Sequence, residues 1–249
     1  MSGHNKWTSI KHKKEKTDAQ KGKIFTKIGR EIAIAVREGG SADPANNGKL
    51  RDVIAKAKAN NMPNDNIQRS IKKAAGEAGG ASFKEIVYEG YAPGGVAVIA
   101  DLVTDNLNRT ASEIRHIFDK CGGSLGATGC VTYMFDFKGV IEIDNALNLS
   151  EDEIMMMALD AGAADVEVGE GAAIIYTSPE DFSEVREKLE NMGVSFLAAD
   201  RRMVPNNTVT VDDPETVAKI QKLIDWLDDY DDTQNVYHNA DLPDEEDEE

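Results

Sequence analysis

The chain has 249 residues, of which 41% are hydrophobic and 29% charged, a composition typical of a soluble globular protein with hydrophobic cores. Its formal net charge is −17, and no stretch approaches the roughly 18 apolar residues that a membrane-spanning helix needs. The N-terminus has no apolar run, so no secretory signal is expected, and Cys121 and Cys130 are too few for a disulfide framework and indicate free, buried thiols in a reducing cytoplasm.

The charge is divided unequally along the chain. Residues 1–75 hold seventeen Lys and Arg against seven Asp and Glu, a net charge of +10. Residues 76–249 hold eleven against thirty-eight, a net charge of −27. A basic head on an acidic body indicates a head that meets a polyanion and a body with another task.

A basic arm and three helices are predicted first. Residues 1–16 are polar and basic, with Trp7 and Ile10 as their only large apolar groups, and are expected to form an extended or mobile arm. Residues 17–39 place apolar side chains at helical spacing. Asp43-Pro44 is a typical start for a second helix, and residues 64–76 predict a third. Three short amphipathic helices make a small helical bundle.

The pattern changes after the glycine-rich linker at 76–82. Residues 84–91 and 96–103 predict two strands joined by a turn. A helix is expected from about residue 108 to 120, and Thr110 with Glu113 would form a capping box there unless the cap falls a residue or two earlier.

Residues 138–204 then alternate regularly between strands and helices. Strands are predicted at 140–143, 165–168, 172–176 and 194–204, with helices at 150–161 and 178–191. Ser150 and Glu153 predict a capping box for the first of these helices. The order β-α-β-β-α-β is the ferredoxin-like arrangement.

The C-terminal segment, like the segment at 84–135, is predicted to contain strands and one helix. A strand at 208–211, a helix beginning at Asp213-Pro214 and a strand at 234–238 precede an acidic tail. Each segment is too thin to fold alone, so we expect them to combine around the ferredoxin-like part. The predicted domains are residues 1–76 (arm and three helices), 82–135 plus 206–240 (a split α+β domain), 136–205 (the inserted ferredoxin-like domain) and 241–249 (the tail).

Five motifs in the chain resemble one family. They are GHNKWTSIKHKK at 3–14, DAQKGKIFTKIGREI at 18–32, NNMPNDNIQRSIKK at 60–73, YEGYAPGGVAV at 88–98 and TDNLNRTASEIRHIFDKCGGSLG at 104–126. They resemble the YebC family of probable transcriptional regulators, whose mitochondrial relatives are translational activators of cytochrome c oxidase. The resemblance covers nearly the whole chain, and Ser9, where relatives are expected to carry a small apolar residue, departs from it. It implies a three-helix domain followed by two α+β domains, and a cytoplasmic protein described as DNA-binding in bacteria and linked to ribosomes and translation.

The basic N-terminal region holds the candidate nucleic-acid-binding residues. They are Lys6, Trp7, Lys11, His12, Lys13, Lys14, Lys16, Lys21, Lys23, Lys27 and Arg30. Lysine and arginine neutralise phosphates and release counterions, largely without regard to sequence. Trp7, outside any predicted core, is placed to stack on an unpaired base. The alternative is an ordinary solvated face, with an arm that pairs with the protein's own acidic body.

The kind of nucleic acid is left open by these residues. No helix pair shows a clear helix-turn-helix pattern, and lysine, rather than the guanine-reading arginine, predominates. A lysine-rich arm with one aromatic residue suits structured or ribosomal RNA as well as DNA. A DNA-binding transcriptional regulator and a ribosome-binding or RNA-binding translation factor are therefore both carried forward.

Catalysis, a metal and a cofactor are not expected. The four histidines show no ligand spacing with cysteines or carboxylates. Gly122-Gly123-Ser124-Leu125-Gly126 has the spacing GxSxG, but this glycine-rich segment is expected to form a turn. Arg109 at a helix start is a candidate anion site, although a capped helix with Arg109 paired locally explains the pattern better. An enzyme using a cleft between the α+β domains is the third hypothesis. No small-molecule substrate and no membrane partner are expected.

Overall fold

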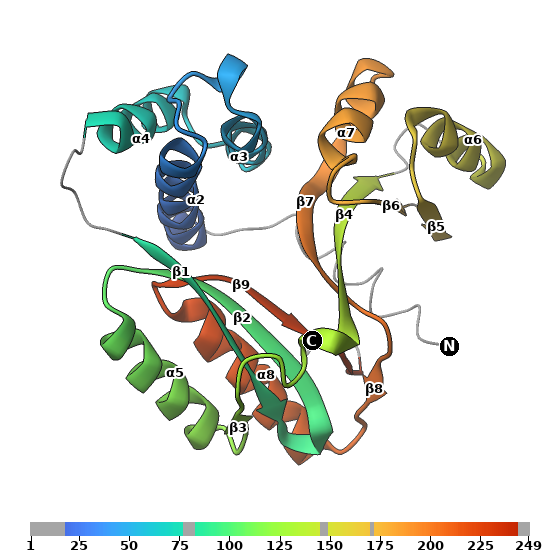
Figure 1. The fold of residues 1–249 in the computed structure, drawn as a ribbon. Coiled ribbons are helices and arrows are strands. Elements are labelled where there is room, and N and C mark those ends of the chain that lie inside the picture. The colour runs from blue at the N-terminus through green and yellow to red at the C-terminus, as the bar shows by residue number, and fades with distance from the viewer. Residues whose placement is uncertain (1–17, 77–82, 145–148, 170–171, 244–249) are drawn as a thin grey trace. The chain divides into compact units, whose positions relative to one another are not determined.

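The computed structural model describes residues 18–76, 83–144, 149–169 and 172–243 (Figure 1). The chain divides into two compact units. Of the described residues, the first unit contains 83–136 and 204–243, and the second contains 18–76, 137–144, 149–169 and 172–203. The predicted arm lies outside the described residues, as does most of the predicted acidic tail.

The second unit begins with three helices. They are α2 (Asp18–Glu38), α3 (Gly48–Ala59) and α4 (Asn64–Gly76), with a 3-10 turn η1 (Pro44–Asn46) before α3. The apolar stripe predicted on the first helix is confirmed, because Ile28 and Ile32 are almost fully buried and pack with Leu50 of α3 and Ile67 of α4. The helical part therefore has a core of its own.

The start of α3 differs from the sequence prediction. Asp43 caps only the turn η1, and Asn47 caps α3 through its side chain, which accepts a hydrogen bond from Leu50 N at 3.0 Å. Asn47 is buried, and its Nδ2 also donates to Ala35 O of α2 at 2.8 Å. This contact between helices fixes the helix start four residues later than Asp43-Pro44 predicts.

The rest of the second unit belongs to the β-α-β-β-α-β segment. Its elements are β4 (Phe135–Asp144), α6 (Glu151–Ala161), β5 (Asp165–Gly169), β6 (Ala172–Thr177), α7 (Phe182–Asn191) and β7 (Phe196–Pro205). The sheet order is β5-β6-β4-β7, and both β4 and β5 pair antiparallel with β6. The predicted capping box of Ser150 and Glu153 is confirmed. Helix α7 starts at Phe182, because Ser178 to Asp181 form a hydrogen-bonded turn before it.

The first unit is built on an antiparallel sheet of order β3-β1-β2-β9. Its elements are β1 (Lys84–Ala92), η2 (Pro93–Gly95), β2 (Val96–Thr104), α5 (Leu107–Lys120), β3 (Ser124–Leu125), η3 (Thr132–Met134), β8 (Val209–Thr210), α8 (Pro214–Asp229), β9 (Thr233–His238) and β10 (Ala240–Asp241). Strand β9, from the C-terminal segment, pairs with β2. Helices α5 and α8 share one hydrophobic core with this sheet.

The N-terminus of α5 corrects a second prediction. The cap is Asn106, whose side chain accepts from Arg109 N at 3.1 Å, so Thr110 and Glu113 do not form a capping box. Thr110 is fully buried, and its hydroxyl is engaged by Thr104 and Asp232. A long-range contact to residue 232 is invisible to local sequence patterns, which explains the error.

The predicted fold class is confirmed. An N-terminal group of three helices is followed by two α+β parts, and the ferredoxin-like segment is inserted between the strands and helices of the other.

Candidate nucleic-acid interface

The predicted site residues fall into two groups in the structure. Lys6, Trp7, Lys11, His12, Lys13, Lys14 and Lys16 lie outside the described residues, so their placement stays a prediction. Lys21, Lys23, Lys27 and Arg30 lie on α2. Lys21 and Lys23 are exposed, whereas Lys27 and Arg30 are half-buried.

Helix α4 adds a basic face that the sequence reasoning missed. Arg69, Lys72 and Lys73 are exposed, at spacings of three and four that bring side chains onto one face of a helix. Ile67 and Ile71 are buried on its other side. Within the described residues, Arg69 and Lys72 have no hydrogen-bond or ion-pair partner. The signal was available, since these cations alternate with the apolar positions of the motif at 60–73.

Other cations of the helical part serve the fold instead. Lys49 pairs with Glu38 at 2.6 Å, and Arg51 donates to the carbonyls of Pro44 and Ala45. Lys56 pairs with Glu31 at 2.8 Å. Burial acts to lower the pKa of Lys56, but Glu31 outweighs it and the pKa is raised. Lys56 therefore stays charged and holds α3 against α2.

A polar network within the second unit fixes α3 against the ferredoxin-like part. Asp52 of α3 accepts from Arg201 Nη1 at 2.6 Å and from Ser183 Oγ at 2.8 Å. The same guanidinium donates through Nη2 to Ser183 Oγ at 2.9 Å and through Nε to Pro179 O at 2.7 Å, and it lies 4.8 Å from the centre of the Phe182 ring. A fork-shaped cation with four partners sets an orientation that a lysine could not.

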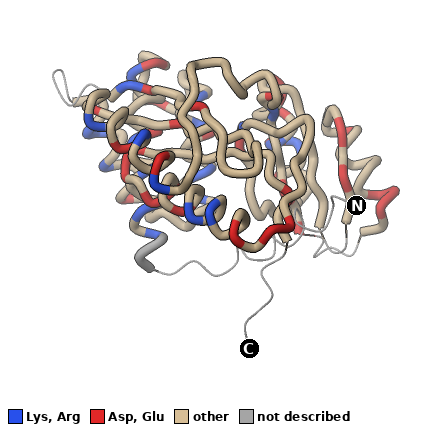
Figure 2. Tube along the Cα trace, turned by 90° about the horizontal axis from the view of Figure 1, so that it is seen from below, with Lys and Arg blue, Asp and Glu red and all other residues tan. Residues whose placement is uncertain are grey.

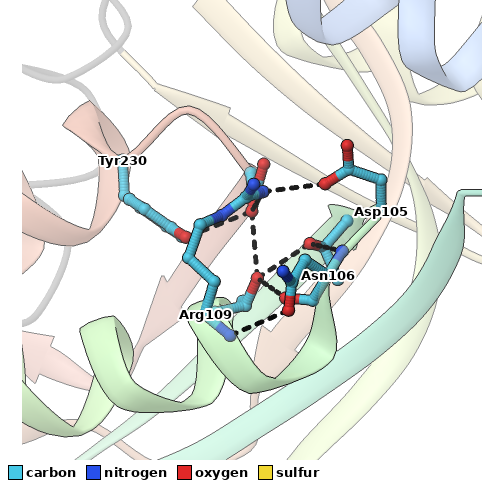
Figure 3. Close-up of polar contacts among 7 residues, drawn as sticks. Asp105, Asn106, Arg109 and Tyr230 are labelled. Carbon is cyan, nitrogen blue, oxygen red and sulfur yellow. Dashed lines mark hydrogen bonds and ion pairs between the residues drawn. The ribbon is translucent and has the colours of Figure 1, made fainter. Parts of the chain in front are cut away.

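The alternative anion site at Arg109 is already occupied by the protein itself. Figure 3 shows the Arg109 side chain extending from α5 toward Asp105 and the Tyr230 region. Arg109 Nη2 lies 2.9 Å from Asp105 Oδ1 and 2.8 Å from Asp232 Oδ2. Asp232 Oδ2 also accepts from Thr110 Oγ1 at 2.9 Å and from Tyr230 OH at 3.1 Å.

The electrostatics of this cluster identify it as structural. Burial acts to raise the pKa of Asp232, but hydrogen bonds from Arg109, Thr110 and Tyr230 outweigh it, so the pKa lies below its ordinary value. The pKa of Arg109 is raised by the same contacts. The buried Asp232 carboxylate thus neutralises the cation that would have attracted a ligand, and local pairing of Arg109 is confirmed.

Potential metal ligands and two thiols also occur in the described part of the chain. No set of three or more His, Cys, Asp or Glu side chains among the described residues is placed to hold a metal ion. Both thiols are unpaired, and burial raises the pKa of Cys121 and of the half-buried Cys130. No described helix combines the length and apolarity needed to cross a membrane.

The architecture and the basic helical part define a three-part protein of helical and α+β modules, and sequence comparison gives its family. Residues 5–77 match the profile described as the TACO1/YebC protein N-terminal domain, and residues 83–240 match that of the TACO1/YebC second and third domain. The chain belongs to the TACO1/YebC family.

Relatives from bacteria are similar over nearly their whole length. A probable transcriptional regulatory protein of Acetivibrio thermocellus is 62% identical over 239 residues, covering 96% of this chain and 98% of the relative. One from Clostridium novyi is 59% identical, covering 98% and 99%. A crystal structure of a conserved hypothetical protein from Aquifex aeolicus matches with a TM-score of 0.84 and 49% identity, covering 94% of this chain and 96% of that one.

Proposed function

We propose that this chain is a non-enzymatic regulator of gene expression, a transcriptional regulator of the YebC type that binds DNA through its basic N-terminal region. Its relatives carry the name probable transcriptional regulatory protein. The observation that carries the proposal is the segregation of charge, a net +10 over residues 1–75 against −27 over the remainder. A cytoplasmic location and the absence of a small-molecule substrate are part of the same proposal.

The proposed mechanism is phosphate contact by an arm and two helices. Lysines of the arm, Lys21 and Lys23 of α2, and Arg69 and Lys72 of α4 would each neutralise phosphate charge and release counterions. Trp7 would stack on an unpaired base. Residues 1–76 contain thirteen lysines and four arginines. This ratio favours backbone contact over base reading, which relies chiefly on arginine forks.

A second candidate is supported by the same ratio. A lysine-rich surface with one stacking residue suits structured RNA, so a ribosome-binding translation regulator is the alternative. The acidic body disfavours binding on any other face, because like charges repel. Both candidates therefore use the same surface and differ in the polyanion.

One experiment separates the two candidates. The full chain is tested for co-sedimentation with ribosomes and for retardation of duplex DNA at one physiological salt concentration. DNA binding without ribosome retention supports the transcriptional proposal. Retention on ribosomes with DNA binding lost contradicts it and favours the translational alternative.

The surface is tested by charge reversal with a matched control. Lys11, Lys13 and Lys14 changed together to Glu should weaken polyanion binding and flatten its dependence on salt. The control changes three exposed lysines outside the basic region, Lys120, Lys188 and Lys219, to Glu and so alters the net charge equally. Equal losses in both triple variants would show that net charge alone acts and that the arm is not the site.

A further inference from the structure

Helix α6 exposes an apolar face in a segment of the chain that carries acidic and no basic residues. Met155, Met156 and Leu159 are 38%, 66% and 64% exposed, whereas Ile154 and Ala158 on the opposite side are buried. Spacings of three and four join the exposed three into one patch. Isolated exposed apolar residues are ordinary on a surface, but a contiguous ridge of flexible methionine and leucine side chains is typical of a docking surface.

The surroundings of this patch carry a single sign of charge. Asp152 and Asp160 flank it on the same helix face, and both are exposed. Between residues 139 and 185 the sequence has twelve Asp and Glu and no Lys, Arg or His. Helix α6, at the right-hand edge in Figure 1, lies at the same edge in Figure 2. There its trace has red acidic positions and no blue basic ones. The complementary ligand is therefore a basic segment with a few large apolar side chains.

The N-terminal arm of the same chain has this chemistry. Residues 1–17 contain five lysines and one glutamate, and Trp7 and Ile10 are three positions apart. The eleven steps of chain from Trp7 to Asp18 span up to about 38 Å when extended. A compact unit of the size of the second unit is about 35 to 40 Å wide. The extended arm is therefore long enough to reach across it. Helix α2, which follows the arm in the chain, belongs to the same compact unit as α6.

We propose that the exposed face of α6, formed by Met155, Met156 and Leu159 with Asp152 and Asp160, is a docking site for the chain's own N-terminal arm. Trp7 and Ile10 cover the apolar ridge, and the arm lysines face the flanking carboxylates. The arm then has two mutually exclusive partners, α6 and a polyanion. Docking on α6 multiplies the apparent affinity for the polyanion by the fraction of molecules whose arm is free. This competition rests on the proposed function, whereas the docking itself does not.

Trp7 reports the docking directly. The chain has two tryptophans, so Trp226→Phe in the full chain leaves Trp7 as the sole reporter. In that background, Met156→Gln with Leu159→Gln removes apolar contact without changing charge. We expect Trp7 emission to shift to longer wavelength and acrylamide quenching to increase. The control is Leu107→Gln, an exposed leucine on α5 in the other unit, which should leave both signals unchanged.

Binding provides the second readout. The Met156→Gln, Leu159→Gln variant should bind the duplex DNA or the ribosome about fivefold more tightly than the parent, as expected if about four-fifths of the arms are docked. If no polyanion binds, the proposed function fails while the Trp7 signals still decide the docking. Equal Trp7 quenching in parent and variant overturns the proposal. A Trp7 signal that changes with protein concentration also overturns it, because the arm would then dock on a second copy.

Discussion

Arg109 on α5 and Arg69 on α4 are both largely solvent-accessible arginines on amphipathic helices, yet they differ in what surrounds them. Arg109 is neutralised by Asp105 and by the buried Asp232, which collects three side-chain donors. Arg69, within the described residues, has no such partner and shares its helix face with Lys72. An exposed cation therefore indicates an interface only where no carboxylate of the same chain already neutralises it.

The largest expected effect on stability comes from the cluster around Arg109 on α5. Asp232→Ala removes the acceptor of Arg109, Thr110 and Tyr230, and leaves the buried Thr110 hydroxyl short of a partner. We expect the free energy of unfolding to fall by about 3 kcal/mol in urea titration. Asp105→Ala removes only an exposed partner of Arg109 and should cost about 0.5 kcal/mol or less. Equal losses would mean that Arg109, and not the buried carboxylate, carries the stability.

The same variant has a defined pH dependence. Because the pKa of Asp232 is lowered in the folded state, its contribution is present above the unfolded pKa of about 4 and is lost as pH falls through the folded pKa. The difference in unfolding free energy between parent and Asp232→Ala should therefore shrink below about pH 4. A difference that persists unchanged at pH 2 would contradict the depressed pKa.

Arg201 is a second cation that is paired within the protein, here inside the second unit. Arg201→Met loses the hydrogen bonds to Asp52, Ser183 and Pro179 and should destabilise the protein by about 2 kcal/mol. Faster amide hydrogen exchange in α3 should accompany this loss. Arg201→Lys keeps the charge but not the fork, and should recover about half of the loss. Full recovery by lysine would show that charge, not geometry, holds α3.

Asp101 on β2 is a carboxylate in the opposite situation to Asp232. Burial, with a smaller contribution from Glu85, raises the pKa of Asp101 to about 6 despite a hydrogen bond from Tyr237. The folded state thus disfavours the ionised form, and stability falls as pH rises from about 4 to 6. Asp101→Asn should raise the unfolding free energy by about 1 kcal/mol at pH 8 and change it little at pH 4. A loss at pH 8 would show that ionised Asp101 is well satisfied.

The smallest effect on stability should come from α4. Arg69→Ala with Lys72→Ala should change the unfolding free energy by about 0.5 kcal/mol or less, because neither side chain is used by the described fold. The same variant should reduce the slope of log affinity against log salt for duplex DNA by about 2, one phosphate contact for each cation. Arg109→Ala is the matched control and should leave that slope unchanged. A slope unaffected by loss of Arg69 and Lys72 would remove α4 from the interface.

Local patterns in the sequence determined most of the secondary structure and the distribution of charge along the chain. Apolar spacing predicted α2 and α8, alternation predicted the β-α-β-β-α-β segment, and Ser150 with Glu153 predicted the cap of α6. These patterns predict secondary structure correctly because each depends on residues that are close together in the sequence. The concentration of lysine in the first 75 residues likewise needs no structure to be seen.

Tertiary structure decided what each polar side chain does. Asn47, which caps α3, also donates a hydrogen bond to Ala35 O of α2. The Thr110 hydroxyl does not cap α5 but donates to Asp232, 122 residues later in the chain. The division of cations into those paired internally, such as Arg109 and Arg201, and those facing outward, such as Arg69, depends on carboxylates distant in sequence. Hydrogen bonds and ion pairs act over a few ångströms in space, and only the folded chain shows which groups lie within that range.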